Sequence, residues 1–218
     1  MITGVDPTEH GILNNRRPAS EGGEYYWSVD LLKTRTLLDV AHEAGLKTAS
    51  ITWPVTVGAA SDFNLPEFFS KRRGASMDLP TISTKANPRD LPERITKMFP
   101  SFHQQFVDDR TRILAVRYLL KTERPDFMLV HLVDLDEEQH QNGPFTPEAI
   151  SILEYQEELI GTALQDLPSN YVVIIVSDHG FEKIDREVNL NLAAKERLRH
   201  SGGALPSMQT IHVSLISL

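Results

Sequence analysis

Two kinds of segment alternate along the chain: segments whose apolar residues recur with the period of a helix, and short uninterrupted apolar runs. Apolar residues recur every three or four positions, the helical period, in the ranges 31–44, 113–120 and 149–163. Compact apolar runs typical of buried strands occupy the ranges 47–53, 127–133 and 171–176. Helices alternating with strands predict βαβ units, and hence an α/β fold of three α/β/α layers around a largely parallel sheet.

Signals that begin and end elements support this pattern. Gly45 suits a helix C-cap, Pro54 stops the strand before it, and Thr146-Pro147 forms a cap and first-turn pair for the third helix.

A chain of 218 residues fits a single domain. Residues 58–110 are rich in Pro, Ser, Asn and mixed charge, which predicts an irregular insertion with short helices. Near the end of the chain, the pattern predicts a helix over 188–199 and a strand over 210–218.

Composition narrows the possible partners. The formal net charge of -8, without an extended basic cluster, gives no electrostatic basis for binding a nucleic-acid duplex. The chain has 0 cysteines, which excludes disulfides and thiolate ligands, so any metal must be held by nitrogen and oxygen. No apolar stretch approaches the roughly 20 residues of a membrane span, and residues 1–30 lack the pattern of a signal peptide. Localisation and oligomeric state stay open.

Asp and His side chains follow two of the predicted strands. Asp178 and His179 come directly after the 171–176 run, and Asp136 and His140, four residues apart, follow the 127–133 run. One helical turn would place the second pair on one side of a helix. Because adjacent parallel strands end at the same sheet edge, the two pairs together predict a site for two divalent metal ions. Asp and neutral His are the usual ligands of zinc, manganese or iron, with zinc the first choice and manganese the next, and two such ions suit phosphoryl displacement on a small phosphate ester.

Simpler interpretations exist for each residue type alone. Asp178-His179 would also fit a capped strand end with a surface histidine, and the Asp136 pair an ordinary acidic turn. His131, inside an apolar run, favours a packed core position. Trp27 and Trp53 favour packing over a base-stacking platform.

Four motifs in order resemble the alkaline phosphatase superfamily, and within it the type I phosphodiesterase/nucleotide pyrophosphatase group. Residues 3–15 (TGVDPTEHGILNN) resemble the family's T-G-x-x-P-x-x-H-G-I-x-x-N segment, and Trp53-Pro54 its W-P element. Residues 136–140 resemble D-x-x-G-H, with Gln139 in place of Gly, and residues 177–180 are S-D-H-G. The resemblance implies an alkaline phosphatase-like core.

The same resemblance implies roles for particular residues. Asp136 and His140 would bind one metal, Asp178 and His179 the other, and Asn15 a phosphate oxygen. The family's Thr or Ser nucleophile and one metal-binding Asp would fall before Met1, and His212 is the candidate for a late histidine ligand whose glycine context is absent here. The expectation is therefore a hydrolase fragment, incomplete at both ends, with an exposed sheet edge where a first strand belongs.

Two other classes of function compete with this interpretation. One is a catalytically impaired or non-catalytic α/β module that retains remnant metal ligands, and the other is an unrelated Rossmann-like fold with acidic turns. Within the hydrolase interpretation, the sequence does not separate phosphate monoesters, nucleotide diesters, phosphonates and sulfate esters. The absence of cysteine disfavours a formylglycine sulfatase.

Overall fold

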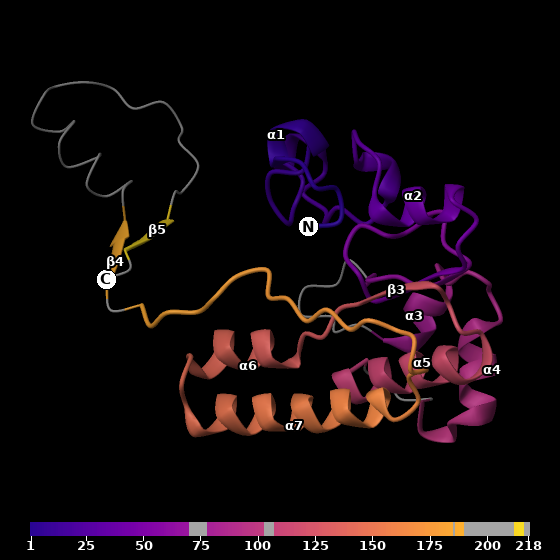
Figure 1. Cartoon of the computed structure of the whole chain (residues 1–218). Coiled ribbons are helices and arrows are strands. Elements are labelled where there is room, and N and C mark those ends of the chain that lie inside the picture. The colour runs from indigo at the N-terminus through magenta and orange to yellow at the C-terminus, as the bar shows by residue number, and fades with distance from the viewer. Residues whose placement is uncertain (70–77, 103–106, 185, 190–211, 216–218) are drawn as a thin grey trace, which may run out of the picture.

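A three-stranded parallel sheet lies at the centre of the molecule. The computed structural model describes residues 1–69, 78–102, 107–184, 186–189 and 212–215. The strand order is β2 (Phe63–Leu65), β1 (Thr48–Ile51), β3 (Phe127–Val130), and β1 pairs in parallel with both neighbours. Figure 1 shows α5 and α7 on one side of this sheet and α2 on the other. The predicted α/β class with a parallel sheet is confirmed.

The helices vary widely in length. The α-helices are α1 (Pro7–His10), α2 (Leu37–Glu43), α3 (Leu79–Ser83), α4 (Leu91–Met98), α5 (Asp109–Thr122), α6 (Asp134–Asn142) and α7 (Pro147–Leu164). Short 3-10 helices are η1 (Ala19–Glu21), η2 (Val29–Leu31) and η3 (Pro100–Phe102). None of the helices in the described part of the chain combines the length and apolar character needed to cross a bilayer.

Side-chain caps explain where three of the helices begin. Thr36 and Asp39 form a reciprocal capping box at α2, so that helix begins at Leu37 and the stripe predicted from residue 31 is shorter than expected. Asp108 caps α5, and Thr146 caps α7 ahead of Pro147. These caps satisfy backbone N–H groups that have no partner within the helix.

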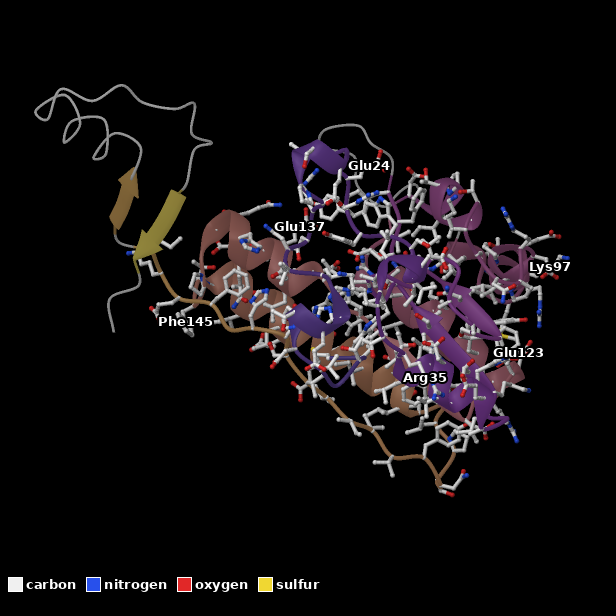
Figure 2. All side chains as sticks on the ribbon, turned by 90° about the horizontal axis from the view of Figure 1, so that it is seen from above. Glu24, Arg35, Lys97, Glu123, Glu137 and Phe145 are labelled. Carbon is white, nitrogen blue, oxygen red and sulfur yellow. The ribbon has the colours of Figure 1, made fainter. Side chains whose placement is uncertain are left out.

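The hydrophobic core lies where β1 and β2 meet α3, α4 and α5. All four β1 residues are buried, as expected for a strand covered on both faces. The buried apolar side chains include Ala49, Ile51, Phe63, Leu65, Leu79, Ile82, Leu91, Ile95, Ile113, Val116, Leu119 and Leu120. Figure 2 shows side chains filling the space between these elements, with Lys97 and Glu123 on its outer rim.

Strand β2 lies inside the segment predicted to be irregular. Its three residues pair with β1, and Asn64 exchanges two backbone hydrogen bonds with Asn87. A strand this short carries too few residues to show a periodic pattern, so only pairing with β1 reveals it. The short helices α3 and α4 in the same segment agree with the prediction.

The predicted strand at 171–176 is wrong. Tyr171 is anchored, since its hydroxyl donates to the Pro125 carbonyl at 2.7 Å, but the residues after it form an extended segment that pairs with no described strand. Val172 is 85% exposed and Ile174 is 80% exposed. β3 is an edge strand of the sheet, and among the described residues its outer edge has no strand beside it. An apolar run without a hydrogen-bonding partner does not become a strand.

The last described elements form an antiparallel pair. β4 (Arg186–Asn189) pairs with β5 (His212–Leu215). The helix predicted over 188–199 is wrong at Val188 and Asn189, which lie in β4, and its other residues lie outside the described part of the chain. The strand predicted over 210–218 is confirmed at 212–215.

Candidate active site

Helix α6 carries the first Asp/His pair. It begins at Asp134, a few residues after β3, and places Asp136 and His140 one turn apart. Asp136 Oδ1 and His140 Nε2 are 3.5 Å apart, so both side chains project to the same side, as predicted. Figure 2 shows Glu137 of the same helix and Phe145 near the turn between α6 and α7.

The second pair lies on the extended segment that follows Tyr171. Asp178 Oδ1 accepts a hydrogen bond from the His179 backbone N–H at 3.1 Å, and Ser177 Oγ donates to the His179 carbonyl at 2.5 Å. The ring itself has Nδ1 3.0 Å from the Gly180 carbonyl, and its other nitrogen, Nε2, faces α6. His179 Nε2 lies 3.4 Å from Asp136 Oδ1 and 3.8 Å from Asp178 Oδ2. The two predicted pairs therefore meet, although the strand expected to carry the second pair is absent.

Asp136 Oδ1 is the centre of this group. The atom is buried and accepts no hydrogen bond, yet the Nε2 atoms of His140 and His179 face it at 3.5 and 3.4 Å. An unsatisfied buried carboxylate oxygen beside two imidazole nitrogens has the donor chemistry that zinc and other divalent ions prefer. The four side chains are 41–66% exposed, and no group of three or more His, Asp or Glu in the described ranges is close enough to hold an ion. The residue types fit a metal, but their present positions do not form a complete ligand set.

Phe181 is a member of the site that the sequence did not suggest. Its ring centroid lies 4.8 Å from that of His140 and 5.1 Å from that of His179, with edge-to-face geometry at both. The ring thus contacts one histidine of each pair. Its position directly after the S-D-H-G motif is the only signal that the sequence offered.

Two partly buried titratable groups, Glu67 and His131, lie near the carboxyl ends of β2 and β3. Burial raises the pKa of Glu67 to about 7, with Arg112 opposing the shift. Burial also lowers the pKa of His131, and the positive charge of Arg112 lowers it further. His131 Nδ1 lies 3.3 Å from the Thr52 carbonyl, so this histidine is partly buried beside the site, not enclosed in the core. Glu67 was not predicted from the sequence.

Asn15 is not brought to the Asp/His group by any contact in the structure. Its side chain is exposed and forms no hydrogen bond with a described residue, while its carbonyl accepts from the Tyr26 N–H at 3.3 Å. The same motif includes α1 and Gly11, whose φ of 83° is left-handed. A Cβ at Gly11 would lie 2.9 Å from the flexible Lys33 side chain, which would have to move, and the positive φ is the main reason that glycine suits this position. The side chain of His212 lies outside the described residues.

Comparison with known proteins identifies the class. The family model described as type I phosphodiesterase/nucleotide pyrophosphatase matches residues 1–214, and the chain belongs to this family. Its members are hydrolases of phosphate esters.

Among similar proteins, venom phosphodiesterase 2 of Crotalus adamanteus is 25% identical over 207 residues, covering 84% of this chain and 21% of that protein. Human ectonucleotide pyrophosphatase/phosphodiesterase family member 1 is 23% identical over 201 residues, covering 84% of this chain and 18% of that protein. The chain thus spans about a fifth of the length of these relatives. Phosphonoacetate hydrolase from Sinorhizobium meliloti 1021 superposes with a TM-score of 0.49 and 19% identity, covering 75% of this chain and 40% of that one.

Proposed function

We propose that this chain forms part of a metal-dependent phosphoric ester hydrolase of the phosphodiesterase/nucleotide pyrophosphatase type. Family membership supports the reaction class. The observation that carries the proposal is the unsatisfied Asp136 Oδ1, which faces imidazole nitrogens from both halves of the site. The proposed substrate is a small phosphate ester.

Each ligand pair has a proposed role. Asp136 and His140 hold one divalent ion and Asp178 and His179 the other, with zinc the first choice and manganese the alternative. Bound ions would stabilise the attacking and leaving oxygens of a displacement at phosphorus. Asn15 donates a hydrogen bond to a phosphate oxygen once the substrate is bound. The Thr or Ser nucleophile and the further Asp ligand are proposed to lie outside residues 1–218.

Zinc titration by calorimetry tests the metal assignment. Zinc is added to the 218-residue chain and to the variants Asp136→Asn and Asp178→Asn. Each substitution removes a carboxylate ligand with little change in shape, and we expect affinity to fall at least about tenfold. Glu137→Gln is the matched control, because Glu137 lies beside Asp136 on α6 and, among the described residues, its carboxylate accepts a hydrogen bond only from the exposed Gln141. Equal zinc affinity in all four proteins would refute the assignment.

The alternative is a non-catalytic module with remnant ligands. The lack of an assembled set of three ligands among the described residues favours it. Hydrolysis of bis(p-nitrophenyl) phosphate by the full-length protein distinguishes the two. A hydrolase should lose turnover in Asp178→Ala and keep it in Glu137→Gln, whereas a module should show no turnover in any form.

A further inference from the structure

A buried ion pair lies at the start of α5. Asp109 and Arg112 are 0% and 2% exposed, and Arg112 Nη1 donates to Asp109 Oδ1 at 2.7 Å. The same guanidinium nitrogen donates to Asp134 Oδ1 at 3.2 Å. A charge pair this deeply buried is costly unless all its members are hydrogen-bonded, so its partners indicate what it holds in place.

The Asp109 carboxylate caps α6 from a different helix. It accepts from the Val133 N–H at 2.9 Å and from the Asp134 N–H at 3.1 Å, and the Asp109 N–H donates back to Asp134 Oδ2 at 3.0 Å. The N-cap residue of α6, Val133, has no hydroxyl or carboxylate and makes no side-chain cap of its own. In contrast, α2, α5 and α7 each have their own capping side chain.

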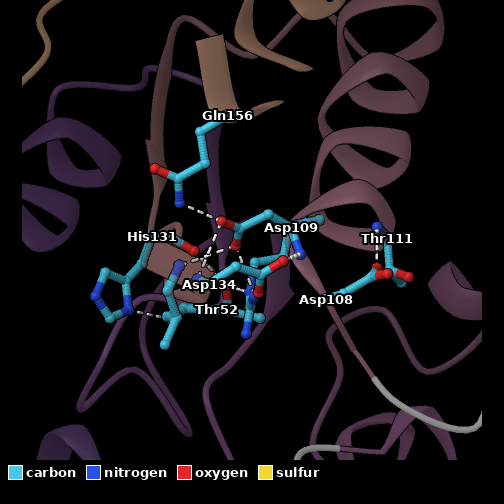
Figure 3. Close-up of polar contacts among 9 residues, drawn as sticks. Thr52, Asp108, Asp109, Thr111, His131, Asp134 and Gln156 are labelled. Atoms are coloured by element: carbon cyan, nitrogen blue, oxygen red, sulfur yellow. Dashed lines mark hydrogen bonds and ion pairs between the residues drawn. The ribbon is translucent and has the colours of Figure 1, made fainter. Parts of the chain in front are cut away.

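Further contacts connect this cap to α7 and the sheet. Gln156 Nε2 of α7 donates to Asp109 Oδ2. Arg112 Nε donates to Thr52 Oγ1 at 3.1 Å, and Thr52 Oγ1 donates to the His131 carbonyl at 2.9 Å. Figure 3 shows Asp109 at the centre of these contacts, between Gln156 and Asp134. The first turn of α6 is therefore fixed to α5, α7 and the ends of β1 and β3.

We propose that Asp109 is a positioning residue for the metal-ligand pair on α6, an inference that rests on the function proposed above. Asp136 lies two residues after Asp134, whose backbone N–H and carboxylate both bind to the Asp109–Arg112 pair. Holding this turn sets the direction in which Asp136 and His140 project. Partners that orient metal ligands typically contribute about 10–100-fold to metal affinity.

Zinc affinity separates positioning from general stability. Asp109→Asn keeps the shape but removes the charge and one acceptor, and we expect zinc affinity to fall about tenfold or more. Asp108→Asn is the matched control, because Asp108 is the preceding carboxylate and its side chain caps its own helix, accepting from the Thr111 N–H at 2.7 Å (Figure 3). We expect affinity within twofold of wild type for this control, at a temperature where both variants are folded. In an Asp136→Asn background, Asp109→Asn should have no additional effect.

Amide hydrogen exchange measures how well the Asp109 cap protects the backbone N–H groups at the start of α6. The Val133 and Asp134 amides should exchange faster in Asp109→Asn, while Asp108→Asn should leave these amides unchanged and keep Thr111 protected, because an Asn side-chain oxygen still accepts from the Thr111 N–H. Unchanged exchange at Val133 and Asp134, or equal zinc affinity in both variants, would overturn the proposal.

Two further results distinguish a failure of the proposed role of Asp109 from a failure of the proposed hydrolase function. If Asp109→Asn does not fold, Gln156→Met removes one donor to the carboxylate and should produce the same changes at smaller size, and their absence would overturn the proposal. If the wild-type chain shows no zinc binding that depends on Asp136, the proposed function fails, and exchange at Val133 and Asp134 alone decides whether Asp109 caps α6.

Discussion

Two apolar runs that both lead to candidate metal ligands have opposite environments. β3 (Phe127–Val130) pairs along its length with β1, and its residues are partly buried. Residues 172–176 are as apolar but have no strand partner in the part of the chain that the structure describes, and Val172 is 85% exposed. Both runs are extended, so the difference lies in what each has beside it.

The comparison shows that a strand depends on its neighbours more than a helix does. α7 satisfies its backbone hydrogen bonds within its own residues, and Thr146 caps its first turn. A β-strand has its hydrogen-bonding partners in another segment. Among the described residues, β3 has such a segment on one side and 172–176 on neither, which leaves an unpaired sheet edge and an exposed apolar segment within this part of the chain.

The largest expected difference between the regions is the cost of losing an apolar side chain. Leu119 of α5 is fully buried in the core, and Leu119→Ala should lower the free energy of unfolding by about 3.5 kcal/mol, because a cavity remains. Ile174, 80% exposed, should cost less than about 0.5 kcal/mol when changed to alanine. Urea unfolding of both variants measures the two costs. Similar costs would mean that residues 172–176 are packed in solution.

The partly buried Glu67 should make the free energy of unfolding depend on pH, whereas an exposed glutamate should not. The pKa of Glu67 is raised by burial from 4.5 to about 7, so the folded state keeps this proton at pH values where the unfolded state has lost it. Stability should therefore fall as the pH rises from about 4.5 to about 7, by up to about 3 kcal/mol. Urea unfolding across this range should show a flatter profile in Glu67→Gln than in wild type. The exposed Glu148→Gln serves as the control, and an unchanged slope in Glu67→Gln would contradict the assignment.

A lysine at position 174 should have the smallest effect on the free energy of unfolding of the changes considered, yet a clear effect on self-association. Unpaired strand edges and exposed apolar runs promote pairing between chains, so the 218-residue chain should self-associate. Ile174→Lys should reduce association while changing the free energy of unfolding by less than about 0.5 kcal/mol. Ile150→Lys, on the exposed side of α7, should leave association unchanged. Sedimentation velocity decides, and a monodisperse wild-type monomer would refute this prediction.

Elements with strong local signals could be predicted from the sequence. The helix at α5 shows a helical period, and α7 also begins at a Thr-Pro pair, so both were found near their observed bounds. β1 and β3 were found from their apolar runs, slightly too long. The strand predicted at 171–176 shows the limit of such signals, since a hydrophobic run does not identify its partner.

In the candidate site, too, features set by local spacing were predicted from the sequence, and features that depend on tertiary contacts were not. The spacing of Asp136 and His140 was enough to predict that they share one side of a helix, and the 3.5 Å separation agrees. Phe181 and Glu67 were not predicted. Phe181 belongs to the site through its ring contacts with the histidines, and the pKa of Glu67 is raised by burial, and neither can be inferred from local sequence. Asp109 was not predicted either, since its role depends on α6 lying against α5.

The sequence by itself determined the family, the α/β class and the residue types available to bind a metal, because these follow from local motifs and periodicity. Only the tertiary structure decided which segments pair, that residues 172–176 pair with no described strand, and that His179 lies 3.4 Å from Asp136. It also decided that α6 is capped by Asp109 from another helix. Local preferences act between residues near in sequence, whereas strand pairing, burial and capping between helices depend on segments that only the folded chain brings together.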